Sequence, residues 1–187
     1  MHRRHLTELL VRYAAAWPAE VSVSERFLAF IGEHDDCLHR SCVPGHITAS
    51  AWILSPDGNS ALLTHHKKLG RWLQLGGHVD GEVLVEQAAL REAIEESGMT
   101  EFEFVRWGRG PLVPLDLDVH AIPARGREPL HEHWDVRFLL RAGPGQQIVR
   151  SDESNELRWV AAGELTQLTQ EESVLRLARK ARAIGAH

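Results

Sequence analysis

The sequence predicts an α/β fold in which a sheet-containing domain follows two N-terminal helices. Three observations support this class. Apolar residues recur at helical spacing near both ends of the chain, strand-like runs separated by turn signals begin at residue 46, and a glutamate-rich helix interrupts those runs. The length of 187 residues suits one sizeable core. We therefore predict a helical extension at residues 1–44 that packs on a main domain at residues 45–187.

The N-terminal part predicts two helices, at residues 3–16 and 22–35, separated by Pro18. Its apolar stretch superficially suggests a secretion signal. Glu8 and Arg12 interrupt that stretch, so an amphipathic helix is the better interpretation. No run of 18 apolar residues occurs in the sequence, so we expect no membrane-spanning segment and predict a cytoplasmic location.

Strand signals fill the middle of the chain. Two runs, at 47–54 and 61–65, flank the turn sequence S-P-D-G-N-S and predict a β-hairpin. A strand at 72–75 is predicted to lead into a tight turn at Gly76 and Gly77. The remaining predicted elements are a helix at 83–97, strands at 101–107, 113–121, 134–141 and 156–160, and a final helix at 169–184.

The helix at 83–97 carries the strongest chemical signal. Glu92, Glu95 and Glu96 stand at i, i+3 and i+4, so they fall within an arc of roughly 100° on the helix surface. Crowded carboxylates repel each other unless a cation lies among them, and oxygen ligands suit the hard cations Mg²⁺ and Mn²⁺. A solvated acidic face is the common alternative for such a pattern. The glycine-rich turns before the helix favour a ligand site, because glycine lets the backbone approach a ligand closely.

The segment from Gly77 to Met99 resembles the signature of the Nudix hydrolase family: G, five residues, E, seven residues, then R-E-U-x-E-E-x-G-U, where U is a bulky aliphatic residue. The matching residues are Gly77, Arg91, Glu92, Ile94, Glu95, Glu96, Gly98 and Met99. One position departs, because Val83 stands where the family has its first Glu, and Glu82 lies one residue earlier. In the family that Glu mainly supports the site, so the departure leaves the ion-pair partner of Arg91 open. The candidates are Glu82, Glu86 and Asp80.

The resemblance implies an α/β/α sandwich with a mixed sheet and a hydrolase that depends on Mg²⁺ or Mn²⁺. The implied reaction cleaves the pyrophosphate bond of a nucleoside diphosphate linked to another moiety, such as an ADP-sugar, a dinucleoside polyphosphate or a modified nucleotide. Two alternatives stay open: an isomerase of isoprenoid diphosphates on a related fold, and a non-catalytic nucleotide-sensing module. The implied metal ligands are Glu92, Glu95, Glu96 and the backbone carbonyl of Gly76 or Gly77.

The resemblance also implies two further catalytic contributions. Arg91 belongs to the matched motif, and one of the motif glutamates is a candidate base. Many family members supply an additional catalytic Glu from a loop that corresponds to residues 151–156. Glu153 is the first choice for this role and Glu156 the second, with a solvated acidic loop as the alternative.

Alternation on two predicted strands brings other polar side chains together. One strand places Asp116, Asp118 and His120 on a single face, and the next places His131, His133 and Asp135 on a single face. Antiparallel pairing of the two strands would gather all six groups, and two histidines with a carboxylate can bind a transition metal. A solvated sheet face is the alternative. We predict that His133 or Asp135 contacts the substrate or a second metal ion.

Two smaller groups complete the candidates. Lys68 and Arg71 lie in a cationic cluster before the glycine pair and would neutralise distal phosphates, although a plain surface cluster is the alternative. The only cysteines, Cys37 and Cys42, predict reduced thiols rather than a disulfide. A zinc site that combines them with His39 and His46 is a weaker alternative, because the spacing matches common zinc sites poorly.

Charge limits the partners. The formal net charge of −5 argues against binding to nucleic-acid duplexes, which usually requires a basic patch. An acidic protein can still bind a polyphosphate when a metal ion bridges the two. We therefore expect a small-molecule nucleotide as the partner, and the family resemblance adds a homodimer as a further expectation.

Overall fold

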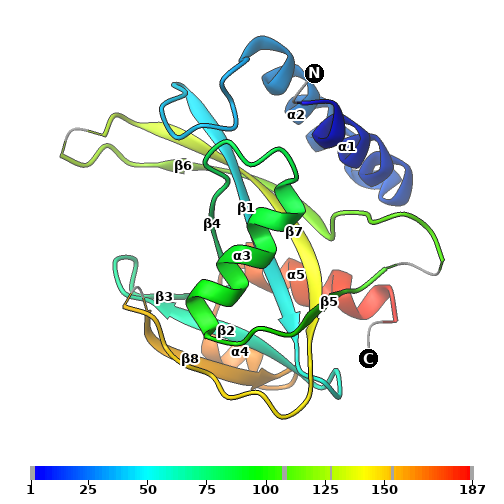
Figure 1. The fold of residues 1–187 in the computed structure, drawn as a ribbon, viewed down its shortest axis with the longest axis vertical. Helices are drawn as coiled ribbons and strands as arrows, with labels where there is room; N and C mark the ends of the chain where they lie inside the picture. The colour runs from blue at the N-terminus through cyan, green and yellow to red at the C-terminus, as the bar shows by residue number, and fades with distance from the viewer. Residues whose placement is uncertain (1–2, 107–108, 127, 153, 186–187) are drawn as a thin grey trace.

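The computed structural model describes residues 3–106, 109–126, 128–152 and 154–185 (Figure 1). In chain order the elements are α1 (Arg4–Ala16), the 3-10 helix η1 (Pro18–Glu20), α2 (Val21–Glu33), β1 (Gly45–Leu54), β2 (Ser60–His66), β3 (Arg71–Leu73), β4 (Leu75–His78), α3 (Val85–Ser97), β5 (Phe102–Phe104), β6 (Asp116–Ile122), β7 (His131–Ala142), β8 (Ser154–Ala161), α4 (Leu165–Leu168) and α5 (Glu172–Ala183).

The strands form one mixed, 8-stranded sheet around β1 and β7, which are parallel to each other. The other edge of β1 pairs with β4 along residues 48–51 and with β2 at its end, both antiparallel. The far edge of β7 is divided in the same way between β6 and β5. Strand β2 also holds β3 and β8. Each of the two central strands therefore pairs with two shorter strands along its outer edge.

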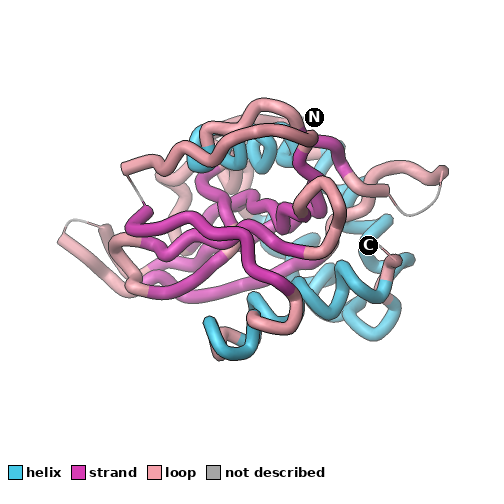
Figure 2. Tube along the Cα trace, turned by 90° about the horizontal axis from the view of Figure 1, so that it is seen from below, coloured by secondary structure: helices cyan, strands magenta, loops and turns pink. Residues whose placement is uncertain are grey.

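Helices cover both faces of this sheet, as Figure 2 shows from below. On one face α1, α2 and α3 contribute Leu9, Phe27 and Ala88 to a core that also holds Ile47 of β1 and Phe138 of β7. On the other face α5 packs Val174 and Leu177 against Trp52, Leu63 and Leu139 of the sheet. Alternate residues of β1 and β7 therefore face opposite layers, as strand geometry requires. The α/β/α sandwich with N-terminal helices is confirmed.

The N-terminal helices are integrated with the rest of the fold. Helix α1 buries Leu6, Leu9, Leu10 and Tyr13 at helical spacing, which confirms its amphipathic pattern. Phe30 of α2 stacks on Trp134 of β7 with ring centroids 4.3 Å apart. Since these residues share a core with the sheet, the division of the chain at residue 44 stays a prediction. In the described part of the chain, no helix combines the length and apolar character that crossing a bilayer requires.

The expected turn at Gly76 and Gly77 is wrong. Both residues lie inside β4, where Gly76 pairs with Ser50 and Gly77 with Ala49. The glycines serve close approach rather than chain reversal, because a Cβ added to Gly76 would lie only 2.2 Å from the Cβ of Ser50. The predicted strand at 72–75 is correspondingly split, with β3 ending at Leu73 and β4 beginning at Leu75.

The predicted start of the last helix, at residue 169, is also wrong. Residues 165–168 form the separate short helix α4, and the long helix begins only at Glu172. Thr169 between them is extended, with φ −142° and ψ 147°, and its Oγ1 accepts a hydrogen bond from the backbone N–H of Glu171 at 3.2 Å. A threonine that caps the following backbone in this way competes with helix formation.

The other elements lie close to their predicted positions. The hairpin of β1 and β2 is confirmed, and so is the antiparallel pairing of β6 with β7. Strand β6 starts at Asp116, after Pro114, and β7 extends further in both directions than predicted. Strand β5 is shorter than the predicted 101–107, of which residue 107 lies outside the described part.

Candidate active site

Helix α3 presents its three glutamates at the boundary between core and solvent. Its buried side consists of Val85, Ala88, Ala89 and Ala93. The side chain of Glu92 is 15% exposed and that of Glu95 57%, whereas Glu96 is buried. The arc that the three glutamates share therefore runs from the buried side of the helix to its solvent-exposed side. Gly98 ends the helix in the left-handed conformation, with φ 70°.

Arg91 ties this acidic face to the neighbouring strand. Its Nη1 donates to Glu92 Oε1 at 2.7 Å and to Glu95 Oε2 at 3.2 Å, and its Nη2 donates to the carbonyl oxygen of His78 at 2.8 Å. The guanidinium is planar and forked, so three acceptors fix its orientation. Arg91 therefore holds two of the three glutamates relative to β4.

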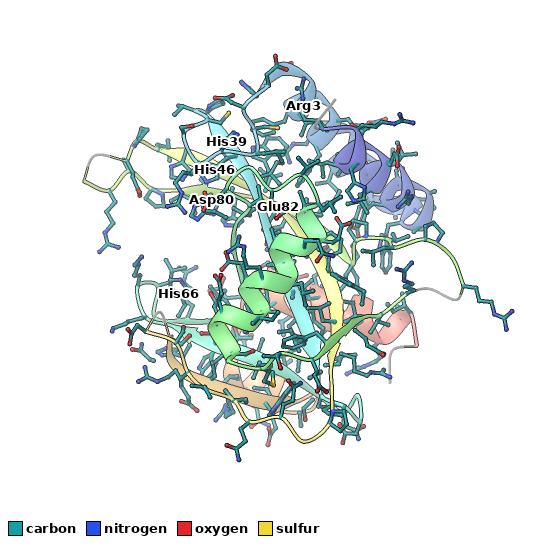
Figure 3. All side chains as sticks on the ribbon, viewed as in Figure 1. Arg3, His39, His46, His66, Asp80 and Glu82 are labelled. Atoms are coloured by element: carbon teal, nitrogen blue, oxygen red, sulfur yellow. The ribbon has the colours of Figure 1, made fainter. Side chains whose placement is uncertain are left out.

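The candidates proposed to replace the missing motif Glu have other partners or lie in solvent. Asp80 forms a two-pronged ion pair with Arg40, at 3.0 Å for each contact. Glu86 contacts His5 Nε2 at 2.8 Å. Glu82 is exposed at the start of the loop that leads into α3 (Figure 3). Arg91 instead pairs within the motif itself, with the glutamates one and four residues further on.

The two glycines of β4 lie against this site. A Cβ added to Gly77 would lie 2.6 Å from Cδ of Glu92, so the carboxylate packs directly on the backbone of β4. Three carboxyl groups beside a glycine backbone form an oxygen-only donor set, and such a set fits Mg²⁺ or Mn²⁺ better than a softer metal. The residues that could hold the cation are therefore Glu92, Glu95, Glu96 and the carbonyl of Gly76 or Gly77.

An open depression of about 470 Å³ lies beside Arg91. The turn between β4 and α3 forms its other walls, through Val79, Asp80, Glu82 and Val83. The positive φ of Asp80 (49°) and Gly81 (87°) shapes this turn. The depression offers space for a ligand at the edge of the acidic face.

The predicted polar sheet face exists, and two of its carboxylates, Asp116 and Asp135, are buried. Asp135 accepts hydrogen bonds from Thr48 at 3.1 Å, Ser50 at 2.8 Å and Arg137 at 2.8 Å. His133 lies opposite His120 on the neighbouring strand. Arg137 in turn reaches Asp118 at 2.9 Å. Asp135 is thus engaged by the interior of the sheet.

A chain of buried ion pairs continues from this face to the helices. Asp116, which is fully buried, contacts Arg137, Arg176 and Lys180 at 3.3, 2.8 and 2.8 Å. Lys180 also donates to the hydroxyl of Tyr13 and to Glu20, each at 2.7 Å. These contacts join α1 and α5 to the sheet.

The other predicted site residues lie apart from α3. Arg71 forms an ion pair with Glu171 at 3.3 Å, and Lys68 is exposed in the turn between β2 and β3. Glu156 is exposed on β8, where it pairs with His65 of β2. Glu153 lies outside the described residues. Cys37 and Cys42 are free thiols, as predicted, and both are buried.

Buried and partly buried histidines near the start of β1 form a second polar group. Burial and neighbouring imidazoles lower the pKa of His46 to about 4 and that of His133 to about 2. Both rings are therefore neutral near pH 7. Neither His46 nor His78 was predicted beside His133, because the strand pairing that joins them connects distant parts of the sequence.

The fold and the acidic helix define a known class of protein. Residues 44–179 match the NUDIX domain, so the chain belongs to the Nudix family. A Mycobacterium tuberculosis protein provisionally named 8-oxo-dGTP diphosphatase 3 is 31% identical over 119 residues, which cover 60% of this chain and 50% of that protein. This match thus spans half of the relative's length.

Solved structures show the same fold. A binary complex of the C. elegans Ap4A hydrolase has a TM-score of 0.58 and 20% identity, covering 75% of this chain and 97% of that one. A NUDIX family hydrolase from Clostridium perfringens has a TM-score of 0.57 and 24% identity, covering 75% and 96%. At these identities the likeness concerns the fold alone.

Proposed function

We propose that the protein is a metal-dependent pyrophosphohydrolase that cleaves a nucleoside diphosphate linked to another moiety. The observation that carries the proposal is the arrangement of Arg91, which fixes Glu92 against the Gly77 backbone while Glu96 lies buried on the same helix. Membership of the Nudix family supports it. The cation is Mg²⁺ or Mn²⁺, because every donor in the set is an oxygen atom.

In this proposal the chain's own groups divide the work. Glu92, Glu95 and Glu96 hold the cation, and Arg91 keeps Glu92 in position. A divalent cation at this place supplies positive charge that stabilises the phosphoryl oxygens. A carboxylate takes the proton from the attacking water. The candidates are one of the motif glutamates and the additional loop glutamate, with Glu153 as first choice and Glu156 as second.

The substrate is a small nucleotide that reaches the site through the depression beside Arg91. The names of the relatives favour two of the expected classes, a modified nucleotide and a dinucleoside polyphosphate. ADP-sugars remain in the substrate panel. Lys68 and Arg71 contact the distal phosphates in this proposal. His133 and Asp135 project from the face of the sheet opposite Gly77 and Glu92, so this proposal leaves them out of the substrate site.

The test is a substrate screen with Mg²⁺ and with Mn²⁺, read by phosphorus NMR. The expected result is cleavage of a pyrophosphate bond in one class of nucleotide. Glu95→Gln and Glu96→Gln should each lower turnover by at least about a hundredfold. Glu103→Gln is the matched control, because Glu103 is an exposed glutamate on β5.

Each contrary result has a clear meaning. Full activity in Glu95→Gln or Glu96→Gln would remove the assignment of the acidic helix. A rearranged product with an intact diphosphate would identify an isomerase. Nucleotide binding by the wild-type chain without any turnover would identify a sensing module.

A further inference from the structure

Five histidines from four strands gather on one face of the sheet, at the end where β1 and β7 begin. In the parallel pairing His46 lies opposite His133, and His131 is two positions earlier on β7. His120 of β6 lies opposite His133. His78 of β4 lies opposite Thr48, two positions from His46. Side chains two positions apart on a strand share a face, so all five rings project the same way.

The rings lie within contact distance of one another. The ring centroid of His46 lies 5.0 Å from that of His78, 5.1 Å from His131 and 4.8 Å from His133. The centroids of His131 and His133 are 5.3 Å apart.

His46 is the buried centre of this group. It is 3% exposed, and neither of its ring nitrogens makes a hydrogen bond of normal geometry among the described residues. Buried polar groups in proteins are normally hydrogen-bonded, and leaving one unsatisfied costs about 1–3 kcal/mol. Figure 3 shows His46 near the labelled residues His39 and Asp80, at the end of the sheet next to the turn before α3. A ligand for these nitrogens would remove the cost.

We propose that His46, His131 and His133 form a binding site for a transition-metal ion of the zinc type. One nitrogen from each ring lies within 4.8 Å of the other two. Tetrahedral coordination with zinc–nitrogen bonds of about 2.0–2.1 Å needs nitrogens about 3.3 Å apart. Rotation of the His131 and His133 side chains, both only partly buried, can close that difference. Three imidazoles leave room for a further ligand, and the ring of His78 lies beside two of them, with its centroid 5.0 Å from that of His46 and 5.2 Å from that of His133.

This site is distinct from the carboxylate site of α3. A Cβ on Gly77 would point at Glu92, so alternation along β4 directs the side chain of His78 to the opposite face. The two donor sets also differ in chemistry. Imidazole nitrogens favour zinc, cobalt, nickel or copper, whereas carboxylate oxygens favour magnesium or manganese. The inference therefore stands independently of the proposed hydrolase activity.

The test uses the full chain, stripped of metal with a chelator and titrated with Co²⁺ in the presence of excess Mg²⁺. Magnesium fills the oxygen site, and cobalt reports its ligands through its visible absorption. We expect one tightly bound Co²⁺ per chain with the spectrum of a nitrogen-ligated, four-coordinate ion, displaced by Zn²⁺. His131→Ala and His133→Ala should each weaken binding by at least about tenfold.

Three comparisons make the result decisive. His65→Ala, a histidine on β2 outside the group, and Glu96→Gln, in the carboxylate site, should both leave cobalt affinity unchanged. Circular dichroism confirms that each variant is folded, and His131→Gln serves as the milder second change at that position. Absence of cobalt binding in the presence of Mg²⁺ would overturn the proposal. So would a thiolate-to-cobalt charge-transfer band, binding that survives both histidine variants, or binding lost in Glu96→Gln.

Discussion

Arg91 Nη1 lies 2.7 Å from Glu92 Oε1, while Nη2 of the same guanidinium donates to the carbonyl of His78 at 2.8 Å. One side chain thus bridges a glutamate of α3 and the strand whose glycines flank the acidic face. The cation would bind between α3 and β4. Arg91 therefore fixes the separation between the Glu92 carboxylate and the backbone of β4 at this site. It acts as a positioning residue rather than as a metal ligand.

Replacing Arg91 should therefore impair turnover through Glu92. We expect Arg91→Ala to lower kcat by about 10- to 100-fold, the range seen when groups that orient metal ligands are removed. Arg91→Lys should recover only part of this loss, because an ammonium cannot hold three acceptors in a fixed plane. Steady-state kinetics at several Mg²⁺ concentrations provides the measurement. If added Mg²⁺ has no effect on the defect, Arg91 does not act through the metal site.

The two glycines of β4 predict opposite results on substitution by alanine. In Gly77→Ala the new Cβ would meet the flexible end of Glu92, at 2.6 Å from Cδ, so the side chain can move while the fold persists. In Gly76→Ala it would meet the backbone of β1, at 2.5 Å from Cα of Ser50. We expect Gly77→Ala to keep its melting temperature and lose activity, and Gly76→Ala to unfold at lower temperature.

Gly32→Ala is the matched control for both glycine variants. Gly32 lies in α2, and no atom lies within 4 Å of its added Cβ. Alanine has a higher helix propensity than glycine, so stability should stay equal or rise. Equal loss of stability in Gly76→Ala and Gly77→Ala would show that the difference in their surroundings has no energetic consequence.

The buried ion pair of Lys180 with Asp116, at 2.8 Å, predicts a strong effect on stability. Lys180→Met leaves Asp116, Glu20 and Tyr13 without their shared donor, and breaking a buried pair in this way costs about 3–5 kcal/mol. Arg179→Met is the matched control on the same helix, because Arg179 pairs with Glu172 in solvent and its loss should leave stability unchanged. Urea denaturation measures both. A negligible loss in Lys180→Met would mean that the remaining cations already balance Asp116.

The lowered pKa of Asp118 leads us to expect that the protein loses stability in acid. Burial opposes ionisation of Asp118, but its hydrogen bond with His120 and the guanidinium groups of Arg137 and Arg176 outweigh burial and hold its pKa well below 3.8. The unfolded chain therefore takes up this proton at a higher pH than the folded protein. The contribution to stability is fully present above the unfolded pKa and is lost as pH falls through the folded pKa.

Asp118→Asn tests this dependence. The variant should be less stable than the wild type at neutral pH, because two guanidinium groups lose a charged partner. Its free energy of unfolding should fall less steeply than that of the wild type between about pH 5 and pH 2. Chemical denaturation at a series of pH values provides the comparison. Parallel curves would show that Asp118 does not set the acid response.

Much of the fold followed from local patterns. The apolar spacing of α1, the turn sequence between β1 and β2, and the glycine after α3 each act over a few residues, so their structures could be predicted. The wrong prediction of a turn at Gly76 and Gly77 has the same cause, because it also relied on a local pattern. Gly76 and Gly77 resemble a turn locally, but the need of β4 to approach β1 closely decided their conformation.

The sequence by itself determined the family, the acidic helix and the set of oxygen donors, because these depend on residue types at short spacing along one helix. Only the tertiary structure decided that Arg91 bridges α3 to β4 and that Asp116 forms ion pairs with cationic side chains of β7 and α5. It likewise decided that the ring nitrogens of His46, His131 and His133 lie close together. The physical reason is strand pairing. The parallel register of β1 and β7 is fixed by packing of the whole sheet between its helices, and no local pattern encodes which distant residues it brings face to face.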